Sequence, residues 1–238
     1  MNDLPIYSAR KLQKDYRANG LVLPVLKGID IDIHRGEILS IVGHSGVGKS
    51  TLLNLLGLLD TPTSGSMIYR GLEGGGDVDL MRQGLKSRAR LRNREFGFVF
   101  QFYHLLPDLS VIENVLLPSM ILFGRNEFRS RRPSLLEKAE RLLDRVGISA
   151  RKDFAPSRLS GGERQRAAIA RALFNEPKVV FCDEPTGNLD TATGSRLHNL
   201  ILELNGAFGV SFVLVTHDLD LAGLAHRKLV MLDGVFVS

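Results

Sequence analysis

The sequence predicts an α/β fold with a parallel central sheet. Ile38–Val42 is a short apolar run with a β-branched centre, and it leads through glycines into a leucine-rich helical pattern. Two further apolar runs of strand length, Lys178–Cys182 and Val210–Val215, alternate with helical patterns. Such runs are typical of strands buried on both faces of a parallel sheet.

The glycine turn after Ile38–Val42 predicts a P-loop NTPase core. It matches G-x-x-x-x-G-K-[ST] between a strand and a helix, the context in which this pattern indicates a phosphate site rather than an ordinary turn. Glycines let backbone N–H groups form an anion-binding nest, Lys49 reaches the outer phosphates, and the Ser50 hydroxyl is a magnesium ligand. The predicted nucleotide-binding residues of this loop are Gly43, His44, Ser45, Gly46, Val47, Gly48, Lys49, Ser50 and Thr51.

Length and composition indicate a globular protein. The chain has 238 residues, of which 44% are hydrophobic and 24% charged, enough for one large α/β domain or two small ones. No basic and apolar leader is visible, and no apolar run approaches the ~20 residues that span a bilayer. We therefore expect a cytoplasmic chain. The single cysteine, Cys182, excludes an internal disulfide, and we interpret it as a core residue rather than a nucleophile.

Much of the net charge of +5 lies in two basic runs. Such runs usually form solvated faces, although a basic surface also suits anionic lipid or nucleic acid. Alternation at every second residue would spread charge around a helix. The two runs consist of Lys86, Arg88, Arg90, Arg92 and Arg94, and of Arg125, Arg129, Arg131 and Arg132.

The N-terminal segment reads as two strands. Ile6–Lys14 and Leu21–Ile33 are β-like, and within the second run isoleucines alternate with polar residues. Tyr16 precedes the turn at Asn19–Gly20. Its ring suits either packing or stacking on a flat base.

The middle of the chain becomes helical. After the phosphate-loop helix we expect a turn at 60–65, a strand at Met67–Tyr69, a glycine-rich loop at 74–76 and the basic helix. A further strand follows over Phe96–Phe100, and Gln101 closes it. From about 102 to 160 the sequence shows helical patterns with no strand patterns between them, which predicts an inserted helical subdomain. Ser134 and Glu137 there have capping-box spacing.

A helix with an unusual first turn follows, in Leu159–Glu163. Ser160 and Glu163 also have capping-box spacing, which is by itself a sufficient structural reason for them. Gly161 and Gly162 are poor helix formers. Their placement exposes backbone N–H groups and predicts a second anion site.

Polar residues end the two later strands. Asp183 and Glu184 follow Lys178–Cys182, at the sheet edge where ligands bind, although they also suit a helix or turn cap. His217 follows Val210–Val215, where it is either an ordinary histidine or a site residue. The amphipathic helix between these strands is predicted to stop at Gly206, and the last strand covers about 228–232.

Taken in order, these motifs resemble the ATP-binding subunits of ABC transporters over nearly the whole chain. The resemblance implies one ABC ATP-binding domain over 1–238, with a P-loop core, an antiparallel β subdomain and a helical subdomain at about 102–160. Gly43–Thr51 is similar to Walker A, Gln101 to the Q-loop glutamine, Ser160–Glu163 to the signature with Glu163 in place of the commoner Gln, Val179–Asp183 to Walker B, Asn188–Asp190 to the D-loop and His217 to the switch histidine.

The same resemblance implies roles for these residues with ATP and Mg²⁺. Ser50, Gln101 and Asp183 correspond to the metal ligands, and Tyr16 to the aromatic that stacks on adenine. Glu184, His217 and Gln101 correspond to the catalytic set, in which Glu184 orients or deprotonates the attacking water and His217 contacts the γ-phosphate. Ser160, Gly161, Gly162 and Glu163 would close over ATP bound to another chain, which implies a homodimer.

The family also implies integral membrane permease subunits as partners, docked at Gln101–Pro107. The segments Gln101–Val115, Gly57–Gly65 and Asp183–Asp190 resemble the ATPases that release lipoproteins from the bacterial inner membrane, which implies the cytoplasmic face of that membrane. Macrolide-export and cell-division branches of the family share the last two segments and remain alternatives.

A third alternative is a soluble relative bound to DNA or ribosomes. Such relatives commonly carry two cassettes or long coiled-coil insertions, and this chain has one cassette and neither. We expect no specific nucleic-acid partner.

Overall fold

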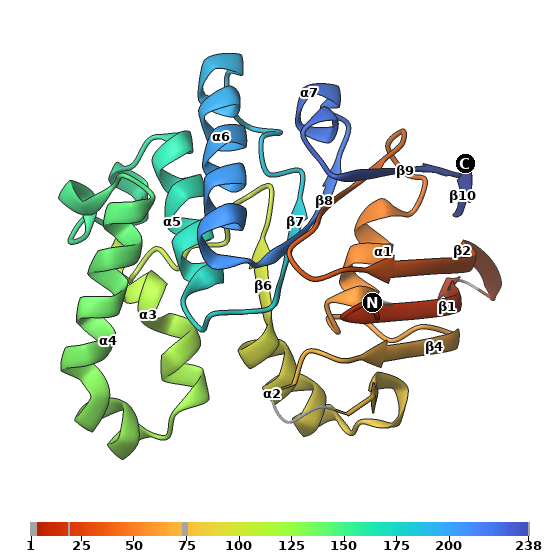
Figure 1. The fold of residues 1–238 in the computed structure, drawn as a ribbon, viewed down its shortest axis with the longest axis horizontal. Helices are drawn as coiled ribbons and strands as arrows, with labels where there is room; N and C mark the ends of the chain where they lie inside the picture. The colour runs from red at the N-terminus through yellow and green to blue at the C-terminus, as the bar shows by residue number, and fades with distance from the viewer. Residues whose placement is uncertain (1–3, 19, 73–75, 238) are drawn as a thin grey trace.

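The computed structural model describes residues 4–18, 20–72 and 76–237. Within these ranges the strands form two sheets, and Figure 1 shows helix α1 (Lys49–Leu56) between them. Gly74 and Gly75 of the predicted glycine-rich loop, and Asn19 of the predicted turn, lie outside the described residues.

The larger sheet is the parallel sheet that the sequence predicts. Its order is β10-β9-β3-β8-β7-β6, and only β10 runs antiparallel, against β9. Because β3 and β8 are buried at every residue, their apolar runs need no alternation. The carboxyl ends of the parallel strands lie along one edge. The strands are β3 (Ile38–Val42), β6 (Phe96–Val99), β7 (Val179–Asp183), β8 (Ser211–Thr216), β9 (Arg227–Leu232) and β10 (Val235–Val237).

The smaller sheet is antiparallel, with the order β2-β1-β4-β5. Isoleucines 29, 31 and 33 of β2 are buried and Asp30 is exposed, so the predicted alternation is confirmed. The register of β1 shifts around Lys11, whose φ is 49°. The strands are β1 (Tyr7–Ala18), β2 (Leu21–Ile33), β4 (Ser64–Tyr69) and β5 (Val78–Asp79).

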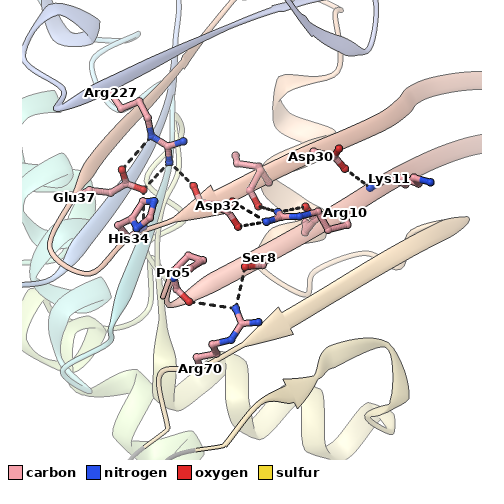
Figure 2. Close-up of polar contacts among 12 residues, drawn as sticks. Pro5, Ser8, Arg10, Lys11, Asp30, Asp32, His34, Glu37, Arg70 and Arg227 are labelled. Carbon is pink, nitrogen blue, oxygen red and sulfur yellow. Dashed lines mark hydrogen bonds and ion pairs between the residues drawn. The ribbon is translucent and has the colours of Figure 1, made fainter. Parts of the chain in front are cut away.

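Half-buried and exposed polar contacts surround the end of β2, where the two sheets meet (Figure 2). Arg227 on β9 donates to Glu37 Oε1 at 2.9 Å and to the Asp32 carbonyl. The Asp32 carboxylate accepts two bonds from Arg10 on β1, at 2.7 and 2.8 Å. A planar guanidinium suits such paired acceptors. Arg227 therefore ties β9 of the larger sheet to the end of β2, and Arg10 ties β1 to β2 within the smaller sheet.

The helices form layers on either side of the larger sheet (Figure 1). Phe212 and Leu214 of β8 pack toward α3, α4, α5 and α6, whereas Val213 and Val215 pack toward α1 and the antiparallel sheet. This two-layer burial is the reason that β8 is apolar throughout. The remaining helices are η1 (Leu80–Arg82), α2 (Leu85–Glu95), α3 (Val111–Leu122), α4 (Arg125–Arg145), η2 (Ser149–Arg151), η3 (Pro156–Arg158), α5 (Gly161–Leu173), α6 (Thr191–Phe208) and α7 (Leu219–Gly223).

Two predicted helix ends are wrong. Ser134 does not cap a helix, because α4 begins at Arg125 and the Ser134 hydroxyl donates to the Arg131 carbonyl inside it, at 2.8 Å. Gly206 does not stop α6, because the helix continues to Phe208, whose ring centroid lies 5.7 Å from the Arg145 guanidinium of α4. Gly209, with a left-handed φ of 61°, is the residue that ends it.

The alternating basic run forms α2 and divides between the interior and the surface. Arg88 is 9% exposed and donates to the Leu80 carbonyl, and Arg92 donates to the Leu58 carbonyl at 2.7 Å. The three exposed cations, four residues apart, lie on one helix face: Lys86, Arg90 and Arg94. The charge is therefore not spread evenly around the helix.

Candidate functional site

The glycine loop lies where β3 meets α1, at the carboxyl edge of the parallel sheet. Gly48 has a φ of 107°, which side-chain-bearing residues rarely adopt, and it begins α1 without any side-chain cap. A Cβ at Gly43 would lie 2.4 Å from the Met231 carbonyl oxygen, so only glycine allows this close approach. The first N–H groups of α1 are thus left for an anion.

Lys49 places a positive charge inside this loop. Its side chain is 7% exposed, and Nζ donates to the carbonyls of Gly43 and His44 at 2.8 and 3.0 Å. Ser45 and Gly46 are exposed on the rim. Backbone amides, a helix N-terminus and an ammonium group converge here, which suits the phosphates of a nucleotide.

The carboxylate that ends β7 meets the start of α1. The Ser50 hydroxyl donates to Asp183 Oδ1 at 3.0 Å. The pKa of Asp183 is raised above its ordinary value, chiefly by burial and also by the nearby charge of Glu184. The hydrogen bond from Ser50 and the charge of Lys49 oppose this shift without cancelling it. The predicted metal ligands Ser50, Asp183 and Gln101 all border the same cavity, and hard oxygen atoms are the donors that Mg²⁺ prefers. The donor set therefore fits this ion.

Glu184 has a strained backbone and a held side chain. Its φ is 46°, and its amide donates to the Val215 carbonyl at 2.9 Å. The carboxylate oxygen Oε2 lies 2.9 Å from His217 Nδ1 and accepts the Thr216 hydroxyl at 3.2 Å. The His217 side chain is 71% exposed, whereas that of Glu184 is 15% exposed. The histidine therefore faces solvent over a mostly buried carboxylate.

One cavity of about 1110 Å³ brings most of the predicted site together. The Walker A residues other than Val47 border it, with Gln101, Asp183, Glu184 and His217. Gln101 follows β6, and its carbonyl accepts a bond from Asn188 of the predicted D-loop at 2.8 Å. Phosphate-binding, acidic and amide groups thus share one hollow at the carboxyl edge of the sheet, as open α/β sheets arrange ligand sites.

Tyr16 and the signature residues stand apart from the described lining of this cavity. Tyr16 is on β1, 39% exposed, with its side chain close to that of Thr51. Ser160 caps α5, accepting from the Glu163 amide at 3.2 Å while Glu163 accepts from the Ser160 amide at 2.8 Å. The predicted capping box is therefore confirmed.

Glu163, the residue that differs from the commoner signature, is an ionised carboxylate paired with an arginine. Arg151 donates to Glu163 Oε1 at 2.8 Å. This bond, with those from the Ser160 amide and hydroxyl, lowers the pKa of Glu163 to about 2. The carboxylate therefore adds little net charge to the helix N-terminus that it caps.

The fold and the cavity define an ATP-binding cassette. A family model described as ABC transporter matches residues 26–187, and the chain belongs to this family. It is 46% identical over 238 residues to the lipoprotein-releasing system ATP-binding protein LolD of Pseudomonas fluorescens, covering 100% of both chains. It is 45% identical to LolD of Shewanella frigidimarina, covering 97% of this chain and 91% of that one.

Solved structures agree with this assignment. The dimeric structure of MJ0796, a bacterial ABC transporter cassette, has a TM-score of 0.84 and 32% identity, covering 98% of this chain and 97% of that chain. A post-hydrolysis state of MJ0796 bound to ADP and Pi has a TM-score of 0.79 and 33% identity, with the same coverage. The predicted α/β P-loop fold and the predicted class, an ABC transporter ATPase, are confirmed.

Sequence reasoning missed several side chains beside the site. Thr216 contacts Glu184, and Asp60 accepts the Tyr16 hydroxyl at 2.9 Å. Asp218 accepts the Thr186 hydroxyl at 3.1 Å. Asp60 lay within a turn signal, and no local pattern connected it with Tyr16. Its partner is visible only in the folded chain.

Proposed function

We propose that this chain is the ATP-hydrolysing subunit of a transporter that releases lipoproteins from the inner membrane toward the outer membrane. The observation that carries the proposal is the 46% identity to a LolD protein over the full length of both chains. The partners are then integral membrane subunits of the LolC and LolE kind, and the chain works peripherally at the cytoplasmic face. No helix within the described ranges is both long and apolar enough to span a bilayer.

The proposed chemistry uses the groups that border the cavity. Loop amides and Lys49 bind the phosphates, and Ser50, Gln101 and Asp183 would hold Mg²⁺, which neutralises phosphate charge when it is bound. Glu184 orients or deprotonates the attacking water, and His217 contacts the γ-phosphate. Most of this catalysis is positioning and electrostatic stabilisation.

We also propose that two copies share each nucleotide. Gly161 and Gly162 begin α5, where the first backbone amides have no acceptor within the helix, yet neither residue borders the described cavity that holds Lys49. A second copy whose α5 N-terminus faces the phosphates would complete the site. Closure of the two copies would then convert ATP binding into movement.

We propose that the membrane partner docks at Gln101–Pro107. This segment lies at the start of residues 102–160, which we propose to be a helical subdomain of the single domain 1–238. Phe102 is 69% and Leu106 44% exposed. Arg171 donates to the Tyr103 carbonyl at 2.6 Å, which holds the segment in place. Leu105, by contrast, packs on the core and is less suited to docking. Exposed apolar groups on a fixed loop suit an apolar cytoplasmic helix.

The test is ATP-dependent lipoprotein release from proteoliposomes that contain the complex purified from membranes. We expect release with the wild-type chain and none with Glu184→Gln, although Glu184→Gln keeps ATP binding. Normal turnover by Glu184→Gln would remove Glu184 from the catalytic role. A complex that moves a small hydrophobic drug, or that co-purifies with cell-wall machinery and moves nothing, would instead place the chain in the export or cell-division branch.

A further inference from the structure

The strand that carries Tyr16 is bonded to the segment that leaves the phosphate-loop helix. The Thr63 amide donates to the Gln13 carbonyl at 2.9 Å, and the Thr63 hydroxyl accepts from the Asp15 amide at 2.8 Å. The Ser64 hydroxyl donates to Gln13 Oε1 at 2.8 Å. The described part of β1 and residues 60–64 therefore form one unit beside the nucleotide cavity.

Asp60 is the polar centre of this unit. Its Oδ2 accepts the Tyr16 hydroxyl at 2.9 Å, and its Oδ1 accepts Lys14 Nζ at 2.8 Å. Lys14 is only 9% exposed, and it also donates to the Thr61 carbonyl at 2.8 Å. Burial works to raise the pKa of Asp60, but bonds from Lys14, Thr61 and Tyr16 outweigh it and hold this pKa below its usual range. The carboxylate thus stays charged at neutral pH.

The Tyr16 ring is restrained from two sides. The Lys14 ammonium lies 4.7 Å from the ring centroid, within the range of a cation–π contact. The hydroxyl is occupied by Asp60, so the ring offers a surface for stacking rather than a free hydrogen-bond donor. The ring is 39% exposed. Lys14 and Asp60, which bond no residue of the phosphate loop, therefore set the orientation of the ring together with the Thr51 side chain of α1.

We propose that Asp60 and Lys14 are positioning residues that hold the Tyr16 ring ready to stack on the base of the nucleotide. The inference rests on the proposed role of Tyr16 in ATP binding. Ordering a side chain on binding costs about 0.5–1.5 kcal/mol. Restraining the ring beforehand should strengthen ATP binding by roughly 2- to 12-fold, through the base alone.

The experiment compares ATP with inorganic triphosphate, which has the phosphates but no base. Dissociation constants for both ligands, with KM and kcat for ATP, are measured on the wild type and on Asp60→Ala. We expect Asp60→Ala to raise the ATP dissociation constant and KM several-fold, and to leave kcat and triphosphate affinity unchanged. Asp15→Ala is the matched control, because its carboxylate has no side-chain bond among the described residues. It should change neither ligand.

Two further variants keep the proposal falsifiable if Asp60→Ala folds poorly. Tyr16→Phe removes the bond to Asp60 but keeps the ring and the Lys14–Asp60 pair, and it should weaken ATP alone. Asp60→Asn keeps one carbonyl acceptor, for the Tyr16 hydroxyl or for Lys14 but not for both, and should restore part of the loss seen in Asp60→Ala. An equal loss of triphosphate affinity in Asp60→Ala and Tyr16→Phe, or no loss in either, would overturn the positioning role.

The same measurements distinguish failure of the proposed function from failure of this inference. If the wild type binds neither ATP nor triphosphate, the nucleotide site itself is wrong, and the positioning role falls with it. If the wild type binds both ligands and Tyr16→Ala leaves the ratio of ATP affinity to triphosphate affinity unchanged, only the proposed stacking of Tyr16 on the base is wrong. If Tyr16→Ala lowers that ratio and adding Asp60→Ala lowers it no further, the two residues act as one unit, as proposed.

Discussion

Thr216 should control how fast the bound nucleotide reacts rather than how tightly it binds. The side chain is fully buried at the end of β8. Its hydroxyl donates to Glu184 Oε2 at 3.2 Å and accepts from the Asp218 amide at 2.9 Å. Thr216→Val keeps the shape and removes both bonds. Because Glu184 is proposed to handle the attacking water, the substitution loosens a catalytic carboxylate without touching the phosphate loop.

The magnitude follows from the contacts. A hydrogen bond to a charged group contributes about 1.5–3 kcal/mol, and 3.2 Å is long for an O–H···O bond, so the lower end applies. His217 still contacts the carboxylate through its amide and Nδ1, at 3.3 and 2.9 Å. The expected loss in kcat is therefore roughly tenfold, with KM unchanged. The Asp218 amide loses an acceptor, which should cost about 1–3 kcal/mol of folding stability.

The assay is steady-state ATP hydrolysis by the isolated chain, with nucleotide affinity and thermal melting measured alongside. Thr216→Ser is the matched control, because it retains the hydroxyl and should keep most of the activity. An equal loss in Thr216→Ser and Thr216→Val would refute the hydrogen-bond argument. So would a rise in KM at constant kcat, since that result would place Thr216 in binding.

The remaining predictions concern the signature and the docking segment. Because Glu163 has a folded-state pKa of about 2, below its ordinary 4.5, its pairing with Arg151 stabilises the fold above pH 4.5 and is lost as the pH falls toward 2. Glu163→Gln should therefore flatten the melting temperature between these pH values, and an unchanged pH profile would contradict the pairing. Phe102→Ala and Leu106→Ala should leave hydrolysis by the isolated chain intact and reduce lipoprotein release, whereas a lowered melting temperature would indicate core packing instead.

The nucleotide cavity was largely predictable, because its parts are short and local. The glycine loop is contiguous, and its glycines already indicate a tight turn, which the φ of 107° at Gly48 confirms. Asp183 and His217 end buried strands, and parallel strands bring such ends to one edge. Position in the chain was therefore enough to place these groups together.

The supporting contacts were not predictable, because they join distant segments. Tyr16 and Asp60 are 44 positions apart, and the turn composition around Asp60 hides its role. Nothing in the sequence distinguishes Arg88 from the other members of its basic run. Its burial depends on a hydrogen bond to the Leu80 carbonyl, which only the folded chain shows. Gly206 failed as a stop signal because packing of α6 outweighs the cost of about 1 kcal/mol for a glycine in a helix.

The most direct test of the central claim, that two chains share each ATP, is hydrolysis by a mixture of Lys49→Ala and Ser160→Arg chains. Each variant alone puts a lesion in every shared site, so both should be inactive. A mixed dimer combines both lesions at one site and leaves the other intact. An equal mixture should then recover up to about a quarter of wild-type activity, since about half of the dimers are mixed and each has one good site. A mixture no more active than its separate components, with both chains folded, would contradict site sharing.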